Sequence, residues 1–283
     1  MNSQAAILNG RYRLTAQLGR GGSGRVFLAE DIRIKKKWAV KFIPFDTLSG
    51  RELAGNEIRF MESMDHPAFP RIVDAFRTEE GCYIVSDYID GRDMRAYLKG
   101  ERLPLRLKCE YALRVLSALR YMHERKPPVL YLDLKPENVM ITGSGEIRLV
   151  DFGIARGLME KGVPFGTRGY AAPEQYKGGG EDQRSDIFAF GMFFYYLLTL
   201  CDPVADAEKQ RALIRNNNSV PKGIRRIILR CTALDMDGRY AGIRKVEREL
   251  RKYLGRPRRR IIRITAALLS FMLLFLLFSA VRR

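Results

Sequence analysis

Three residues in a short run near the middle of the chain have the types and spacing needed for phosphoryl transfer. In the segment 131–138, Asp133 is followed two residues later by Lys135 and five residues later by Asn138. Asp151 then opens an Asp-Phe-Gly triplet. A carboxylate can accept a hydroxyl proton, a lysine can neutralise a moving phosphoryl group, and an amide and a second carboxylate can hold a metal ion. Because carboxylate and amide oxygens suit Mg²⁺, the pattern predicts transfer of a phosphoryl group from Mg-ATP.

A glycine-rich turn near the N-terminus is suited to holding phosphates. Its glycines are Gly19, Gly21, Gly22 and Gly24, and Val26 follows them. Glycine lets a hairpin turn approach phosphates closely enough for backbone N–H groups to donate to them. The turn lies between two predicted strands, not between a strand and a helix, and this argues against a dinucleotide-binding fold. Taken alone, the pattern fits a plain flexible turn equally well.

The surrounding sequence predicts strands first and helices afterwards. Strands are predicted around the glycine turn, at 38–43 and at 82–85, and an imperfect apolar face predicts a helix at 52–64. Beyond a polar connection at 86–93, helices are predicted at 105–124, 186–200, 224–233 and 243–254. The helix at 186–200, with Ser185 as its N-cap, is almost wholly apolar, but its 15 residues suit a buried central helix better than a membrane span. The predicted fold class is α+β, with a β-rich part followed by a mainly helical one.

Composition limits the class of protein. The chain has 283 residues, 46% of them hydrophobic and 29% charged, which is typical of a folded domain. Half of its net charge of +18 comes from residues 248–283, which contain ten basic residues and one acid. No basic run elsewhere is interleaved with aromatic residues, so nucleic acid is not an expected partner. The four cysteines are far apart in the sequence, which indicates free thiols in a reducing compartment.

The segment 264–281 has the length and composition of a membrane-spanning helix. It contains 18 residues without a charge. At about 1.5 Å per residue these span roughly 27 Å, close to the hydrocarbon thickness of a bilayer. The basic segment 255–263 precedes it and predicts that the rest of the chain stays on the cytoplasmic face. We therefore expect a single-pass protein of the cell membrane, with a basic juxtamembrane tether that attracts anionic lipid. A buried core helix is the alternative interpretation of 264–281.

Two further segments complete the pattern. Residues 166–174 read Gly-Thr-Arg-Gly-Tyr-Ala-Ala-Pro-Glu, and an Ala-Val-Lys triplet ends at Lys41, fifteen residues after Val26. With the glycine turn and the segments at 131–138 and 151–153, these motifs resemble, in type and order, the eukaryotic-like Ser/Thr protein kinases of the bacterial type. The resemblance covers residues 11–254. It implies a two-lobed protein kinase fold, with an N-terminal lobe at 11–87, a C-terminal lobe at 88–254 and an ATP site between them.

The resemblance also implies catalytic and metal-binding roles. Asp133 is the expected catalytic base, and Lys135 is expected to contact the transferred phosphoryl group. Lys41 is expected to position the phosphates of ATP and to pair with Glu57. The expected ligands of Mg²⁺, with Mn²⁺ as a second candidate, are Asn138 and Asp151.

Further roles are implied for the nucleotide and for the substrate loop. The residues expected to bind ATP are Gly19, Gly21, Gly22, Gly24, Val26, Ala39, Lys41, Asp87, Ile89, Asp93 and Met140. Among these, Val26, Ala39 and Met140 are expected around the adenine, and Asp93 at the ribose hydroxyls. The resemblance also places Thr167 near Asp133, pairs Glu174 with Arg239, and has Asp186 brace the catalytic loop through backbone N–H groups.

Two residues depart from the family pattern. Tyr131 and Leu132 stand where a His and an Arg usually precede the catalytic aspartate. In many kinases that Arg pairs with a phosphorylated residue of the activation loop, which a leucine cannot do. The segment 151–166 contains no Ser, Thr or Tyr, so we expect activity that does not depend on phosphorylation of this loop. Tyr131 is expected to keep an aromatic packing role beside Phe152.

The expected activity is transfer of the γ-phosphoryl group of ATP to Ser/Thr hydroxyls of proteins at the cytoplasmic membrane face, with autophosphorylation. A membrane-tethered pseudokinase acting as a nucleotide-binding scaffold is the alternative, although such proteins usually lack the lysine, the catalytic aspartate or the metal aspartate. A lipid or small-molecule kinase would share the same phosphoryl chemistry. The sequence leaves dimerisation open.

Overall fold

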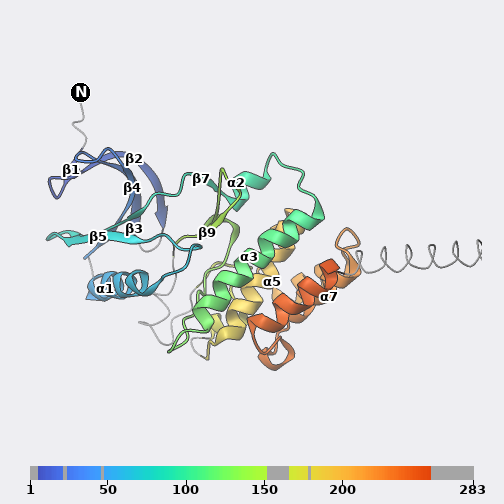
Figure 1. Ribbon diagram of the computed structural model, residues 1–283. Helices are drawn as coiled ribbons and strands as arrows, with labels where there is room; N and C mark the ends of the chain where they lie inside the picture. The colour runs from blue at the N-terminus through green and yellow to red at the C-terminus, as the bar shows by residue number, and fades with distance from the viewer. Residues whose placement is uncertain (1–5, 22–23, 46–47, 152–165, 178–179, 256–283) are drawn as a thin grey trace, which may run out of the picture.

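The protein has two lobes of different composition. The computed structural model describes residues 6–21, 24–45, 48–151, 166–177 and 180–255 (Figure 1). Strands dominate the N-terminal lobe, on the left of Figure 1, and helices dominate the C-terminal lobe. The prediction of an α+β fold with a β-rich lobe followed by a helical lobe is confirmed.

A six-stranded antiparallel sheet forms most of the N-terminal lobe, in the order β1-β2-β3-β4-β6-β5. Its strands are β1 (Ile7–Leu8), β2 (Tyr12–Gly21), β3 (Gly24–Asp31), β4 (Lys37–Pro44), β5 (Ile72–Arg77) and β6 (Gly81–Asp87). Along β4, Trp38, Val40 and Phe42 are buried and alternate with more accessible side chains, as a strand with one covered face requires. Helix α1 (Leu48–Ser63) packs on β4, β5 and β6, and it begins earlier than the predicted start at residue 52.

The glycine-rich turn joins β2 to β3, as the sequence predicted. Gly19 pairs with Val26 across this hairpin, and Gly21 pairs with Gly24. Gly24 has a φ of +147°, and a Cβ at this position would lie 2.0 Å from the carbonyl oxygen of Phe42. No larger residue fits there without moving β4. Gly22 lies outside the described residues.

A second, three-stranded sheet and a set of helices form the C-terminal lobe. The strands are β7 (Gly91–Asp93), β8 (Val139–Thr142) and β9 (Ile147–Leu149). The α-helices are α2 (Met94–Leu98), α3 (Leu105–His123), α5 (Gln183–Thr199), α6 (Ala207–Asn216) and α7 (Lys222–Cys231), and residues 243–255 are also helical. Short 3-10 turns lie at η1 (Pro136–Asn138), η2 (Pro173–Tyr176) and η3 (Met236–Gly238).

Helix α5 is the central helix of this lobe. It packs against α3 and α7 (Figure 1). Its side chains from Ser185 to Leu197 are buried all round. The prediction that this apolar segment is a core helix is therefore confirmed. The predicted N-cap is wrong, because Asp182 caps the helix by accepting the N–H of Arg184. Ser185 is instead buried, and its hydroxyl donates to Glu174.

Within the described ranges, no helix is long and apolar enough to cross a bilayer. The predicted membrane helix at 264–281 lies outside these ranges, as does the predicted tether at 255–263 apart from Gly255. Of the four cysteines, Cys82, Cys109 and Cys231 are buried, Cys201 is exposed, and all are free thiols as expected.

Candidate active site

Lys41, on the inner strand β4 of the N-terminal sheet, connects the two lobes. Its Nζ donates to both carboxylate oxygens of Glu57 on α1, at 2.7 and 2.9 Å, and to Oδ1 of Asp151 at 3.1 Å. Glu57 is only 4% exposed. Burial works to lower the pKa of Lys41, but the charges of Glu57 and Asp151 outweigh it, and the pKa lies above its ordinary value. Lys41 therefore carries a fixed positive charge beside Asp151.

Asp133 lies at the centre of a cluster of polar side chains. Its Oδ1 accepts the hydroxyl of Thr167 at 2.7 Å, and its Oδ2 accepts Lys135 Nζ at 2.8 Å. Lys135 also donates to Thr167 Oγ1 at 3.0 Å. Asn138 Nδ2 donates to Asp133 Oδ2 at 3.0 Å and to its backbone carbonyl at 2.9 Å. These contacts hold the carboxylate in one orientation, with a serine- or threonine-like hydroxyl already within hydrogen-bond distance.

Asp186 holds the backbone just before Asp133. Its Oδ1 accepts the N–H of Leu132 at 2.7 Å, and its Oδ2 accepts the N–H of Tyr131 at 2.8 Å. His123 Nε2 also lies 2.8 Å from Oδ2. Because a carboxylate only accepts hydrogen bonds, Nε2 must carry the proton in this contact. Asp186 is fully buried, and it contacts the catalytic loop in the way the sequence suggested.

The two residues that depart from the family pattern have specific contacts. Tyr131 is fully buried, and its hydroxyl donates at 2.7 Å to the carbonyl of Val150, the residue before Asp151. Phe152, its predicted neighbour, lies outside the described residues. Burial raises the pKa of Tyr131 well above its ordinary value, and nearby carboxylates raise it further, so the phenol stays a neutral donor.

Gln175 helps to hold the backbone before Asp133, and the sequence did not predict this role. Its Nε2 donates to the carbonyl of Leu132 at 3.0 Å, and its Oε1 accepts the N–H of Ala172 at 2.9 Å. It is fully buried. The only sequence signal was its place directly after the Ala-Pro-Glu triplet that ends at Glu174.

The residues predicted to bind the nucleotide come from both lobes. Val26 on β3, Ala39 on β4 and Met140 on β8 are each half-buried, as is Ile89 beyond the end of β6. Asp87 uses its backbone N–H and its carboxylate to bind Arg71.

Asp93 has a contact that the sequence did not predict. Its Oδ1 accepts the N–H of Ala96 at 2.8 Å and so caps α2. A carboxylate has two oxygens, so capping through one of them is compatible with a ribose hydroxyl at the other.

The donor atoms of Asn138 and Asp151 fit a hard divalent cation. Because Asn138 Nδ2 donates to Asp133, its Oδ1 points elsewhere and has no hydrogen-bond partner among the described residues. Val150 donates its N–H to the carbonyl of Asn138 at 2.9 Å, which couples the segments that carry the two candidate ligands. The Asp151 side chain is 43% exposed. Amide and carboxylate oxygens of this kind suit Mg²⁺ or Mn²⁺.

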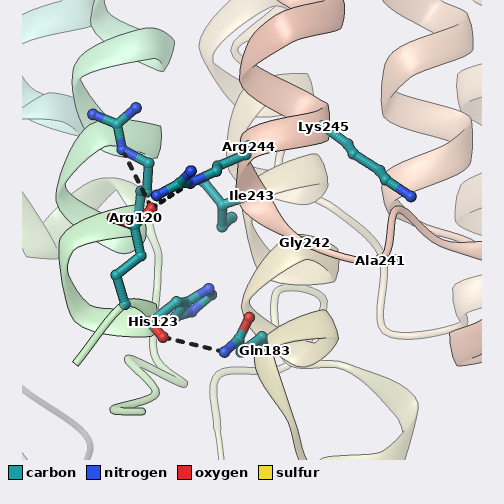
Figure 2. Close-up of a pocket in the computed structure, with 9 residues that line it drawn as sticks. Arg120, His123, Gln183, Ala241, Gly242, Ile243, Arg244 and Lys245 are labelled. Carbon is teal, nitrogen blue, oxygen red and sulfur yellow. Dashed lines mark hydrogen bonds and ion pairs between the residues drawn. The ribbon is translucent and has the colours of Figure 1, made fainter. Parts of the chain in front are cut away.

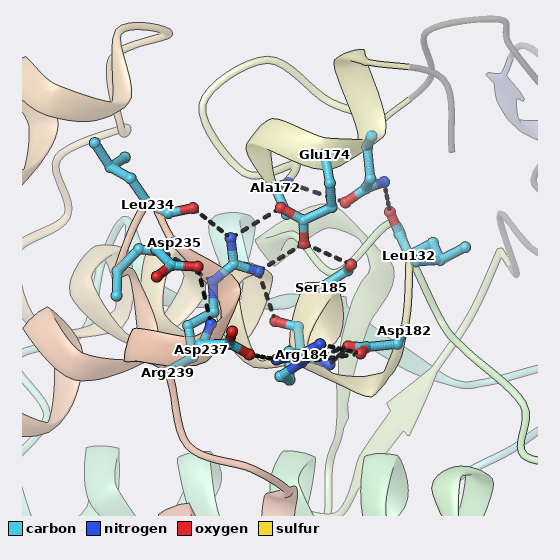
Figure 3. Close-up of polar contacts among 12 residues, drawn as sticks. Leu132, Ala172, Glu174, Asp182, Arg184, Ser185, Leu234, Asp235, Asp237 and Arg239 are labelled. Carbon is cyan, nitrogen blue, oxygen red and sulfur yellow. Dashed lines mark hydrogen bonds and ion pairs between the residues drawn. The ribbon is translucent and has the colours of Figure 1, made fainter. Parts of the chain in front are cut away.

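Glu174 and Arg239 form a buried pair beneath this site (Figure 3). Arg239 Nη1 lies 2.6 Å from Glu174 Oε1, and Nη2 lies 2.8 Å from Oε2. The remaining donors of Arg239 bind the carbonyls of Ala233, Arg184 and Leu234. Ser185 adds a hydrogen bond of 2.6 Å to Glu174. This pair fixes the end of the 166–174 segment to the helical lobe.

A separate pocket lies beside His123, the partner of Asp186 (Figure 2). Its volume is about 230 Å³, and its lining includes Arg120, Gln183 and Arg244. Both arginines are already paired, Arg244 with Glu124 at 2.7 Å and Arg120 with Glu247 at 2.9 Å. None of the predicted catalytic residues lines this pocket.

Comparisons with known proteins agree with this geometry. The protein kinase domain family matches residues 12–251. Serine/threonine-protein kinase PrkC of Bacillus subtilis is 30% identical over 266 residues, which cover 86% of this chain and 40% of that protein. Serine/threonine-protein kinase PknB of Mycobacterium tuberculosis is 31% identical over 208 residues, which cover 68% of this chain and 33% of that protein.

The fold is also found among solved structures. The structure described as PpkA-294 apo form matches with a TM-score of 0.72 and 20% identity, over 88% of this chain and 99% of that one. This likeness shows the fold. The region shared with the two curated relatives covers only 40% and 33% of their length. The family match covers both lobes and every site residue described above, so the chain belongs to the protein kinase domain family.

Proposed function

We propose that this protein is a Ser/Thr protein kinase that transfers the γ-phosphoryl group of ATP to protein hydroxyls. The single observation that supports this most is the Asp133 cluster, in which one carboxylate receives a threonine hydroxyl and a lysine ammonium while an asparagine amide fixes its orientation. An acceptor hydroxyl in place of the Thr167 hydroxyl would give its proton to Asp133. Its oxygen then forms the new bond to phosphorus as the bond to the leaving diphosphate breaks.

The roles of the other residues follow from their charges. Lys41 offers a fixed positive charge to the phosphates, and Glu57 keeps that ammonium in place. Lys135, whose ammonium donates to Asp133, would neutralise the charge that develops on the transferred group. Asn138 and Asp151 would hold Mg²⁺, which neutralises phosphate charge when it is bound.

Asp133→Asn in the full chain tests this proposal. An asparagine of the same shape cannot take the proton, and general base catalysis contributes about 10²- to 10⁴-fold, so phosphate transfer to Ser/Thr of a generic protein should fall by that factor. Asp206→Asn is the matched control, because Asp206 caps α6 on the surface and asparagine caps as well. If Asp133→Asn transfers phosphate as fast as the parent and the Asp206→Asn control do, Asp133 is not the base.

We propose further that the protein is anchored in the cell membrane by 264–281, with the kinase lobes on the cytoplasmic face and 255–263 as a basic tether. The 18-residue uncharged segment and the preceding arginines support this. Fractionation of the full chain and of the chain ending at Gly255 tests it. Equal recovery of both forms in the soluble fraction would contradict the anchor. Autophosphorylation belongs to the same proposal and would appear as label on the full chain that is absent from Asp133→Asn.

A further inference from the structure

Arg168 is a cation next to the proposed catalytic site. It follows Thr167, whose hydroxyl lies 2.7 Å from Asp133 Oδ1. The Arg168 side chain is exposed. Within the described part of the chain, it makes neither a hydrogen bond nor an ion pair.

The backbone that carries Arg168 is fixed on both sides. The N–H groups of Tyr170 and Ala171 donate to the carbonyl of Thr167, at 3.0 and 2.9 Å, and form a tight turn. Gly169 has a φ of +85°, and a Cβ there would lie 2.4 Å from the carbonyl oxygen of Pro203. Tyr170 is buried, and its hydroxyl donates to Asp202. The guanidinium of Arg168 therefore projects from a rigid turn.

Arg95, which shares Asp202 with Tyr170, is already paired. Arg95 donates through both Nη atoms to Asp202 and through Nε to Glu137, which lies two residues after Lys135. Its guanidinium also lies 4.7 Å from the centre of the Tyr196 ring. A basic side chain of a substrate would have to compete with Arg95 for these two carboxylates.

Tyr176 is an exposed aromatic side chain eight residues after Arg168. It is 39% exposed, on the turn η2 that ends the same segment. Burial raises the pKa of its phenol, and the charges of Arg168 and Asp133 both act on it, in opposite directions. The Arg168 side chain is therefore close enough to Asp133 for both charges to act on the same phenol.

We propose that Arg168 selects protein substrates that carry a carboxylate or a phosphate next to the accepting Ser or Thr. This inference rests on the proposed kinase function. An acceptor hydroxyl bound at Asp133 places its neighbouring residue within reach of a guanidinium that starts one residue from Thr167. The planar guanidinium binds carboxylate and phosphate through two parallel hydrogen bonds. A basic residue beside the acceptor finds no free carboxylate at Glu137 or Asp202, because Arg95 already binds both.

The test compares peptides that differ only in the residue beside the acceptor, which is Asp, Gln or Lys, placed on either side. With the full chain, we expect kcat/KM for the best Asp peptide to exceed that for its Gln counterpart by about three- to tenfold, the range of a partly exposed charged contact. In Arg168→Gln this ratio should fall to about one, and in Arg168→Glu the Lys peptide should become the preferred one. Arg33→Gln, a change of an exposed arginine in the β3–β4 turn, should keep the ratio of the parent.

Each outcome separates this inference from the proposed function. Transfer to all peptides with equal kcat/KM, or an acidic preference that survives in Arg168→Gln, would overturn the role of Arg168 and leave the kinase assignment intact. If the parent prefers the Lys peptide, the role of Arg168 is likewise overturned and the kinase assignment is unaffected. Absence of transfer to every peptide and to generic proteins would instead contradict the kinase function, and the inference would fall with it.

Discussion

Replacing Glu174 by Gln leaves the guanidinium of Arg239 buried without its countercharge. The Arg239 side chain has no exposed surface and that of Glu174 has 10%. All five N–H donors of Arg239 are used, two of them on Glu174. Removing one partner of such a pair lowers the free energy of unfolding by about 3 to 5 kcal/mol, because the remaining charge is buried away from water.

This cost is large enough to measure. At about 2 to 4 °C per kcal/mol for a domain of this size, the melting temperature should fall by about 6 to 20 °C. Far-UV circular dichroism of the full chain is the suitable assay, because the single tryptophan, Trp38, lies in the other lobe and would report on that lobe. Glu101→Gln, on an exposed acid without a partner in the described chain, is the matched control.

A double-mutant cycle decides whether the pair itself is responsible. The combined variant Glu174→Gln with Arg239→Met removes both charges, so its loss of stability should be smaller than the sum of the two single losses by about 2 to 3 kcal/mol. A loss of unfolding free energy below about 1 kcal/mol in Glu174→Gln would refute the reasoning, since it would mean that the Arg239 charge finds other partners. Single losses that add up to the loss of the double variant would refute it as well, since they would show no coupling between the two residues.

Three further outcomes follow from the same structure. Asp186 accepts three N–H donors, and in Asp186→Asn the amide NH₂ must face at least one of them. We therefore expect the free energy of unfolding, measured in urea, to fall by about 1.5 to 3 kcal/mol. We also expect kcat to fall by a larger factor than KM for ATP changes. Tyr131→Phe leaves the carbonyl of Val150 without its hydroxyl donor, which should cost about 1 to 3 kcal/mol in the same assay; an unchanged midpoint would show that this bond contributes nothing. Burial alone would raise the pKa of Glu174, but hydrogen bonds from Arg239 and Ser185 outweigh it and hold the pKa below its ordinary value. Its contribution to stability is thus complete above the unfolded-state pKa and is lost as pH falls through the folded-state pKa, so acid should destabilise the parent more steeply than Glu174→Gln.

Local patterns in the sequence predicted the elements that carry the site. The glycine turn, the strand that carries Lys41 and the helix that carries Glu57 were all recognisable from spacing and apolar periodicity. The start of α1 was misplaced because its first turn lacks a clear apolar face, and the cap of α5 was misplaced because two polar residues, Asp182 and Ser185, were both suitable. The side-chain hydrogen bond, which a sequence does not reveal, selects between them.

Contacts between distant polar residues could not be predicted from the sequence. Arg95 meets Glu137 and Asp202, which are 42 and 107 residues away along the chain. Charged residues of these types are usually solvated, and no periodic signal marks the few that meet. The role of Gln175 was missed for the same reason, because its partner is a backbone carbonyl 43 residues away.

Leu132 shows how a departure in sequence can be compensated in structure. The sequence indicated that this residue cannot bind a phosphorylated loop, yet its backbone has a φ of +62°, which is unfavourable for a leucine. Asp186 accepts its N–H and Gln175 donates to its carbonyl, so both backbone polar groups are held from two separate elements. These bonds fix the peptide directly before Asp133 whatever the side chain at 132 does. The position of Asp133 therefore depends on Asp186 of α5 and on Gln175, directly after the 166–174 segment, and neither contact involves a phosphate.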